Sequence, residues 1–178
     1  MRHGGKILID QLRIQGVKRV FCIPGESYLA ALDGLLESGI ETIVGRHEGG
    51  VTMMAEAYGK LTGEPGVVFV TRGPGATNAV TGMTDALMDS IPIIVLSGQV
   101  PTFMIGNDAF QEADTIGITR PCTKHNWLVK DINDLSNVMH EAFKVATTGR
   151  PGPVLVDIPK DIQFAKAKYK KPKIEKKL

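Results

Sequence analysis

Three ionisable side chains follow a short apolar run near the end of the first quarter of the chain. Residues 42–44 are Thr-Ile-Val, and Arg46, His47 and Glu48 come next, before two glycines and a run rich in Met and Ala. A glutamate in the first turn of a helix commonly complements the helix dipole. A carboxyl group at a strand end, partly withdrawn from water, can instead accept and release a proton. The residues alone leave both interpretations of Glu48 open.

A glycine-rich loop follows another apolar run. Residues 72–78 read Arg-Gly-Pro-Gly-Ala-Thr-Asn. Such a loop before a helix can hold an anion, because free N–H groups and the helix dipole attract negative charge. The loop lacks the Gly-Lys-Ser/Thr ending of a P-loop, and Asn78 stands where a dinucleotide-binding G-x-G-x-x-G has its third glycine. A tight turn and an anion cradle therefore both remain open.

The stretch from residue 99 to residue 122 has no clear period and contains Phe110 and Gln111. Segments of this length without regular structure are usually functional or mobile, although Phe110 could simply anchor a short helix to the core. We find no Ser-His-Asp arrangement and expect no metal site. Cys22 and Cys122 show no metal-ligand spacing, and we expect both to be reduced and partly buried.

Six short apolar runs predict the strands that must position these residues, the fifth run being the weakest. They cover residues 19–23, 41–45, 66–71, 91–98, 126–129 and 153–159. Nearly continuous runs indicate strands covered on both faces. Helical patterns separate them at residues 7–15, 28–36, 50–61, 77–88 and 134–147. The sequence therefore predicts an α/β fold, a doubly wound and mainly parallel six-stranded sheet with helices on both faces.

Four polar or glycine-rich loops leave the carboxyl ends of these strands, at residues 24–27, 46–49, 71–78 and 97–101. Ligands of such sheets bind outside the carboxyl ends of the strands. We therefore expect one rim of the sheet to form the site.

Length and charge indicate one domain with a basic end. A chain of 178 residues is the size of a single domain, and we assign it residues 1–163. Residues 164–178 are read as a basic linker or tail, because the last thirteen residues hold seven of the 21 basic residues. The start of the chain lacks a signal-peptide pattern, and no apolar run approaches ~20 residues. We expect a cytoplasmic protein that has neither nucleic acid nor a membrane as a partner.

The motifs together resemble the N-terminal, pyrimidine-binding domain of thiamine-diphosphate-dependent enzymes, and most closely the large, catalytic subunit of acetolactate synthases. The segments that carry this resemblance are "GVKRVFCIPGES", "RHEGG", "MAEAYG", "GVVFVTRGPGATNAVTGMTDALMDSIPIIVLSGQVP", "IGNDAFQEADTIGITRPCTKHNWLVKD" and "AFKVATTGRPGPVLVDIPKDIQ". They extend over nearly all of residues 16–163. The resemblance implies that Glu48 is catalytic, hydrogen-bonding N1′ of the cofactor's aminopyrimidine ring and relaying a proton.

The same resemblance implies further roles. The implied cofactor-binding residues are Glu48, Pro24, Gly25, Gly73, Pro74, Asn78, Gln111 and Arg150, and the implied substrate-pocket residues are Phe110, Gln111 and Lys160. Arg150 matches an arginine that contacts FAD in acetolactate synthases, although a cation at a helix end would look the same. Lys160 matches a lysine at the channel mouth, although a solvated lysine would look the same.

The implied activity is that of a carboligase in branched-chain amino acid biosynthesis. It decarboxylates a 2-keto acid such as pyruvate and transfers the acyl unit to a second 2-keto acid. Thiamine diphosphate is the expected cofactor, with FAD in the acetolactate synthase branch. Mg²⁺ would bind only through a diphosphate-binding domain, because the Gly-Asp-Gly motif of that domain does not occur here. We therefore expect an incomplete enzyme that lacks the central and diphosphate-binding domains. It would act as a homodimer or larger oligomer, or with a partner chain that carries the diphosphate domain.

Three alternatives stay open. The chain could be a non-catalytic interaction or regulatory module, a split subunit of a related 2-keto acid decarboxylase, or a nucleotide- or flavin-binding domain of another kind. The chain also departs from the family at the usual Pro-Gly-Gly or Pro-Gly-Ala turn, which here reads Pro-Gly-Glu-Ser with Glu26. This change adds a carboxylate near the implied substrate pocket, so the identity of the 2-keto acids stays open.

Overall fold

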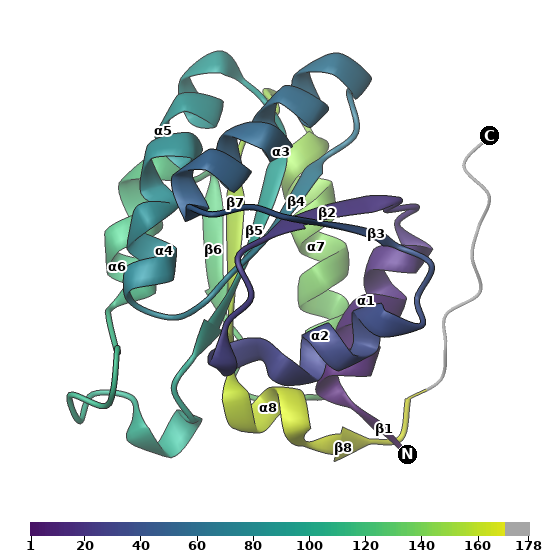
Figure 1. The fold of residues 1–178 in the computed structure, drawn as a ribbon, viewed down its shortest axis with the longest axis vertical. Helices are drawn as coiled ribbons and strands as arrows, with labels where there is room; N and C mark the ends of the chain where they lie inside the picture. The colour runs from purple at the N-terminus through teal and green to yellow at the C-terminus, as the bar shows by residue number, and fades with distance from the viewer. Residues whose placement is uncertain (170–178) are drawn as a thin grey trace.

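The computed structural model describes residues 1–169, and its centre is a six-stranded sheet in which every pairing is parallel (Figure 1). The strand order is β3-β2-β4-β5-β7-β6. The strands are β2 (Arg19–Cys22), β3 (Glu41–Val44), β4 (Gly66–Val70), β5 (Ile93–Gln99), β6 (His125–Leu128) and β7 (Val154–Pro159). All six strands were predicted, and their bounds differ from the predicted ones by at most two residues.

Helices cover both faces of the sheet, which confirms the doubly wound fold. One face carries α1 (Gly4–Ile14), α2 (Leu29–Leu36) and α7 (Leu135–Thr147). The other carries α3 (Glu48–Thr62), α4 (Pro74–Asn78), α5 (Val80–Asp89) and α6 (Thr115–Thr119), as Figure 1 shows.

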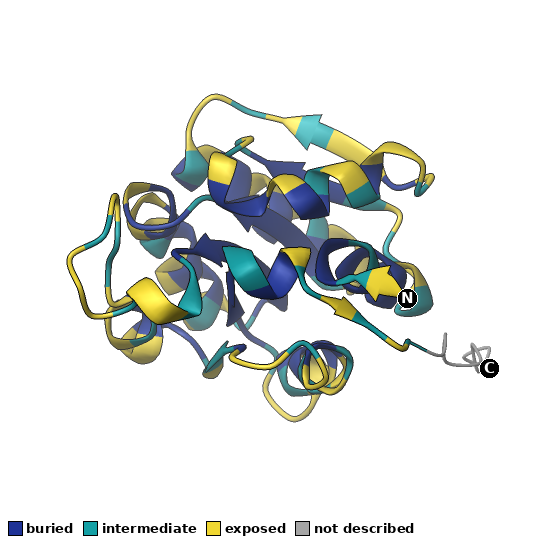
Figure 2. Cartoon of the chain, turned by 90° about the horizontal axis from the view of Figure 1, so that it is seen from below, coloured by how far each residue is buried: buried dark blue, intermediate teal, exposed yellow. Residues whose placement is uncertain are grey.

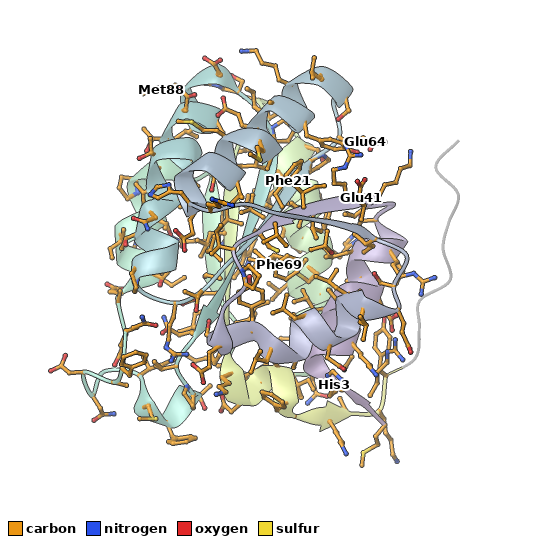
Figure 3. The ribbon with its side chains drawn as sticks, viewed as in Figure 1. His3, Phe21, Glu41, Glu64, Phe69 and Met88 are labelled. Carbon is orange, nitrogen blue, oxygen red and sulfur yellow. The ribbon has the colours of Figure 1, made fainter. Side chains whose placement is uncertain are left out.

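The core forms two apolar layers, one on each side of the sheet, because successive strand residues point to opposite faces. In β4, Phe69 packs in the layer under α1, α2 and α7, whereas Val68 and Val70 pack under α3 and α5. Phe69 stacks on Tyr28 with ring centroids 5.6 Å apart, and Phe21 belongs to the opposite layer (Figure 3). Figure 2 shows the buried strands between helices whose outer surfaces are exposed. Both faces of the central strands are therefore dry, which explains their continuous apolar sequences.

The edge strand β3 is more exposed than its apolar sequence predicted. Thr42 and Val44 are exposed, and Val44 retains 60% of its accessible surface. Among residues 1–169, β3 pairs only with β2, so less of it is covered than of a central strand. The predicted strand at residues 41–45 is therefore present, but the prediction that it is buried on both faces is wrong.

The helices differ from the predicted ones at three places. α1 begins at Gly4, three residues before the expected start. α3 begins at Glu48, two residues before the expected start. The helix predicted at residues 77–88 is two helices, α4 and α5, with Ala79 between them. The stretch at residues 99–122 contains α6 and two short 3₁₀ helices, η2 (Thr102–Met104) and η3 (Arg120–Cys122). A third 3₁₀ helix, η1 (Glu26–Tyr28), precedes α2. Both cysteines are free, and both are fully rather than partly buried.

The described part of the expected tail is ordered against the start of the chain. Phe164 ends α8 (Lys160–Phe164), and β8 (Lys166–Ala167) pairs antiparallel with β1 (Arg2–His3). The remainder of the predicted tail, residues 170–178, lies outside the described residues. The domain boundary at residue 163 stays a prediction. None of the helices within residues 1–169 has both the length and the apolar character that crossing a membrane requires.

Candidate functional site

The loops that follow the parallel strands meet at one rim of the sheet, as predicted. Two glycines allow this close approach. A Cβ on Gly25 would lie 2.5 Å from Cβ of Thr71, and a Cβ on Gly73 would lie 2.0 Å from the carbonyl oxygen of Gln111. Gly73 also has φ +49°, in the region that favours glycine. The loops after β2 and β4 and the stretch at residues 99–122 therefore form one packed surface.

Glu48 stands at this rim as the first residue of α3. The helix begins there because Nδ1 of His47 accepts a hydrogen bond from the backbone N–H of Gly49, at 3.1 Å. Side-chain acceptors at this position satisfy N–H groups that have no partner within the helix. His47 is thus a helix cap, and its neighbour Glu48 is half-buried. The start of α3 fixes where the carboxyl group lies.

Asn78 holds one oxygen of that carboxyl group. Its Nδ2 donates to Oε2 of Glu48 at 3.0 Å. A Cβ on Gly75 would lie 3.4 Å from Oε1 of Glu48 and 2.8 Å from Cγ2 of Thr71, so the glycine keeps the space beside Oε1 open. No described residue donates a hydrogen bond to Oε1. The carboxyl group is therefore oriented through one oxygen, and the other can serve a ligand.

A second charged cluster lies on the same rim and consists of Glu26, Arg72 and Lys160. Nη2 of Arg72 donates to Oε2 of Glu26 at 2.6 Å, and Nζ of Lys160 donates to the other oxygen, Oε1. The hydrogen bond from Lys160 is the main cause that holds the pKa of Glu26 below its usual range, and the hydrogen bond from Arg72 is the next. The Arg72 side chain is only 7% exposed. The cluster thus contains two cations and one carboxylate.

Phe110 completes the surroundings of Arg72. Nε of Arg72 donates to the carbonyl oxygen of Phe110 at 2.9 Å, and the guanidinium lies 5.5 Å from the centre of the Phe110 ring. Phe110 as a whole is 73% exposed. Phe110 therefore does not anchor a helix to the core, which was the alternative left open above, but lies over a buried cation.

A buried hydrogen-bond network supports the rim from below. Oδ1 of Asp157 accepts from the Ser97 hydroxyl at 2.6 Å, and its Oδ2 accepts from Nε2 of Gln99 at 2.9 Å. Gln99 also donates to the carbonyl oxygen of Ala113 at 3.3 Å. Burial raises the pKa of Asp157 to about 7. This network ties β5 and β7 to the stretch that carries Phe110 and Gln111.

The structure brings most of the predicted site residues together. Those at the rim are Glu48, Asn78, Gly25, Gly73, Pro74, Phe110, Gln111 and Lys160, and Pro24 is exposed in the loop after β2. Gln111 adopts φ +58° and packs its carbonyl on Gly73.

Arg150 lies elsewhere, because it precedes the amino end of β7. Its Nε donates to the Ser90 hydroxyl at 2.7 Å, and its Nη2 donates to the carbonyl oxygens of Leu87 and Met88 at 3.0 and 2.8 Å. Met88 lies near the upper end of the molecule in Figure 3. Arg150 therefore stabilises the carboxyl end of α5, and the structure does not bring it to Glu48.

Sequence reasoning missed Arg72 as a site residue and did not pair it with Glu26. The one signal was Glu26 itself, a carboxylate in a turn where the family usually has Gly or Ala. Within the described residues, no three His, Cys, Asp or Glu side chains are grouped so that they could hold a metal ion.

Sequence comparison shows which known proteins the chain resembles. Residues 2–118 match the thiamine pyrophosphate enzyme family, N-terminal TPP binding domain. The chain is 56% identical over 162 residues to the mitochondrial acetolactate synthase catalytic subunit of Aspergillus candidus, which covers 90% of the chain and 23% of that protein. It is 50% identical over 163 residues to acetolactate synthase isozyme 2 large subunit of Escherichia coli, covering 92% of the chain and 30% of that protein. Chloroplastic acetolactate synthase of Arabidopsis thaliana is also 50% identical over 163 residues, covering 91% and 24%. The chain thus spans less than a third of the length of these relatives.

Proposed function

The chain belongs to the thiamine pyrophosphate enzymes, whose N-terminal TPP-binding domain it contains, and on that premise we propose that it supplies the pyrimidine-binding half of an acetolactate-synthase-type active site. The reaction is the decarboxylation of a 2-keto acid such as pyruvate and the transfer of its acyl unit to a second 2-keto acid. The identity of about half to acetolactate synthases supports this reaction type. The diphosphate-binding part of the site comes from sequence that the relatives contain beyond this chain.

The observation that carries the proposal is the carboxyl group of Glu48, fixed at the rim with one oxygen held and the other open. An aminopyrimidine ring offers ring nitrogens and an exocyclic amine, and a carboxylate is the partner that can both accept a hydrogen bond from it and exchange a proton with it. The glycines at positions 25, 73 and 75 keep side chains out of this part of the rim. The residues present therefore fit the pyrimidine half of thiamine diphosphate.

When bound, thiamine diphosphate supplies the nucleophilic carbon and the electron sink that decarboxylation of a 2-keto acid requires. Glu48 holds and returns a proton at Oε1, which is the oxygen that no described residue engages. Asn78 orients Glu48 by donating to Oε2. Positioned acid–base groups of this kind contribute roughly 10²–10⁴-fold to a rate.

The remaining assignments belong to the same proposal. Phe110, Gln111 and Lys160 line the side of the site from which the 2-keto acid enters, and their place on the rim supports this role. Mg²⁺ and the diphosphate are held outside this chain, in a homodimer or larger assembly located in the cytoplasm. FAD contact by Arg150 rests on the resemblance alone, because the guanidinium hydrogen-bonds the end of α5.

The experiment is the substitution Glu48→Gln in the whole protein that contains this chain. Glutamine keeps the size of the side chain and its bond to Asn78 but cannot exchange the proton. We expect kcat/KM for pyruvate to fall by about a hundredfold or more, while the thermal midpoint of unfolding stays unchanged. Calorimetric titration with thiamine diphosphate reports binding independently of turnover.

The matched control is Glu41→Gln. Glu41 is an exposed carboxylate that pairs with Arg19 at the amino end of β3, away from the rim (Figure 3). Its loss should leave activity unchanged. Activity of Glu48→Gln within about threefold of the unsubstituted protein would refute the role of Glu48 and favour the alternative of a non-catalytic interaction module.

A further inference from the structure

The cluster of Glu26, Arg72 and Lys160 has a charge pattern that bears on which 2-keto acids the rim accepts. One carboxylate is held by two cations that come from the ends of two other strands, Arg72 after β4 and Lys160 after β7. We propose that Glu26 is a specificity-determining residue: it is an internal counter-ion that occupies the position a second substrate carboxylate would need. The pocket thus accepts 2-keto acids with uncharged side chains and rejects 2-keto dicarboxylic acids. This inference rests on the proposed function.

The burial of the Arg72 side chain is the first observation that supports this role of Glu26. The Arg72 side chain is 7% exposed, and a buried guanidinium without a counter-charge costs several kcal/mol. Arg72 therefore needs an anion at all times, whether or not a substrate is bound. Glu26 supplies that anion from the chain itself.

The orientation of the Arg72 guanidinium is the second observation that supports this role. The carbonyl oxygen of Phe110 engages Nε of Arg72, and the Phe110 ring lies 5.5 Å from the guanidinium carbon. The backbone N–H of Arg72 donates to the Ser27 hydroxyl at 3.2 Å, which fixes the start of the side chain. The Nη2 edge of the guanidinium is left for an anion, and Glu26 lies there at 2.6 Å.

Competition is the third reason. A carboxylate attached to the same chain has a high effective concentration at its partner, of the order of millimolar or more. A second carboxylate on a free ligand would have to displace Glu26 from both Arg72 and Lys160. The displaced Glu26 would then repel the ligand, so the discrimination comes from repulsion as well as from lost attraction.

Proximity to Glu48 makes the cluster part of the same site. Thr71 lies between the two, because its hydroxyl is 2.8 Å from the hydroxyl of Ser27, the neighbour of Glu26. On the other side, a Cβ on Gly75 would lie 2.8 Å from Cγ2 of Thr71 and 3.4 Å from Oε1 of Glu48. A small ligand near Glu48 therefore comes within reach of the charged cluster.

The test compares pyruvate with 2-oxoglutarate as substrates of the whole protein and of its Glu26→Gln variant. The readout is the ratio of kcat/KM for 2-oxoglutarate to kcat/KM for pyruvate. We expect this ratio to rise about tenfold or more in the variant, because Arg72 and Lys160 become available for charge-assisted hydrogen bonds to the second carboxylate. A ratio unchanged within about threefold, or a lower one, would overturn the proposal.

Calorimetry with unreactive acids provides a readout apart from turnover. Glutarate, a dicarboxylate, should bind the Glu26→Gln variant about tenfold more tightly than the unsubstituted protein, whereas butyrate should bind both equally. Glu41→Gln is the matched control, since it removes a carboxylate from another guanidinium, that of Arg19, and should change neither affinity. Equal glutarate affinities for the unsubstituted protein and Glu26→Gln would count against the proposal.

A second variant covers the case in which Glu26→Gln does not fold because Arg72 is left unpaired. Lys160→Met keeps the buried ion pair and removes only the outer cation. Glu26 then has one neutralising partner fewer, and the 2-oxoglutarate to pyruvate ratio should fall about threefold; a rise or no change would refute the inference. If the unsubstituted protein converts no 2-keto acid, the proposed function fails while the glutarate titration still tests Glu26. If it is active and the ratios do not move, only the role of Glu26 fails.

Discussion

Replacing Asp157 with asparagine should change how the stability of the domain depends on pH. Asp157 lies in β7 with 1% of its surface exposed, and its two oxygens accept hydrogen bonds from Ser97 and Gln99. Burial raises its pKa to about 7, whereas an aspartate in an unfolded chain titrates near ~3.9. Between these two values the folded chain keeps a proton that the unfolded chain has released.

The sign and size of the effect follow from this difference. As pH rises from about 4 to about 7, the unfolded chain binds fewer protons than the folded one, so the free energy of unfolding falls. The loss is complete once pH exceeds the folded pKa. A difference of roughly three pH units at ~1.36 kcal/mol per unit gives a total of about 4 kcal/mol. The asparagine side chain of the variant cannot ionise, and its amide oxygen can still accept from Gln99 while its amide nitrogen donates to Ser97.

The assay is urea unfolding followed by circular dichroism, at pH 4.5 and at pH 7.5, for the unsubstituted chain and for Asp157→Asn. From pH 4.5 to pH 7.5, the free energy of unfolding of the unsubstituted chain should fall by roughly 3–4 kcal/mol more than that of Asp157→Asn. Asp89→Asn removes an exposed partner of Lys60 and serves as a control that should shift little. A relative change below about 1 kcal/mol for Asp157→Asn would mean that the folded carboxyl group is ionised throughout, and the reasoning would fail.

Three further substitutions test how the elements are held together. Gly5→Ala in α1 would place a Cβ 2.1 Å from the carbonyl oxygen of Ala30, so α1 and α2 must separate, and urea unfolding should show that the free energy of unfolding falls by about 3 kcal/mol. Gly50→Ala has no heavy atom within 4 Å of its added Cβ, so its free energy of unfolding should rise by about 0.5–1 kcal/mol. Equal effects of the two substitutions would contradict the packing argument. Arg150→Met should cost about 1 kcal/mol in the same assay, because the carboxyl end of α5 loses its donors. Thiamine diphosphate affinity should not change, and loss of FAD from the purified protein at unchanged stability would instead support an FAD contact.

The sequence predicted the strands well because a strand buried on both faces must be apolar at nearly every position. Val68 and Phe69 illustrate this, since adjacent residues enter opposite layers of the core. The same rule failed at Val44, because the pattern does not reveal which strand lies at the edge of the sheet. The start of α3 was missed because a single hydrogen bond to the His47 ring sets it.

The sequence predicted those site residues that stand in a recognisable local motif. Glu48 stands in a recognisable motif, and its place at a strand end follows from the apolar run before it. The pairing of Glu26 with Arg72 was not predictable, because it depends on β2 and β4 being neighbours in the sheet although β3 lies between them in sequence. The position of Arg150 depends in the same way on α5, some 60 residues earlier in the chain.

The short pairing of β1 with β8 constrains when the fold can be completed. Arg2 lies opposite Ala167, and the backbone N–H of Gly4 donates to the carbonyl oxygen of Ala165 at 3.0 Å. Joining residues so far apart costs loop-closure entropy unless the intervening chain is already compact. Synthesis delivers the amino-terminal end first, so the ribosome releases β1 long before the strand that pairs with it. We therefore expect these hydrogen bonds to form late in folding, after the six-stranded sheet has brought the two ends of the described chain together.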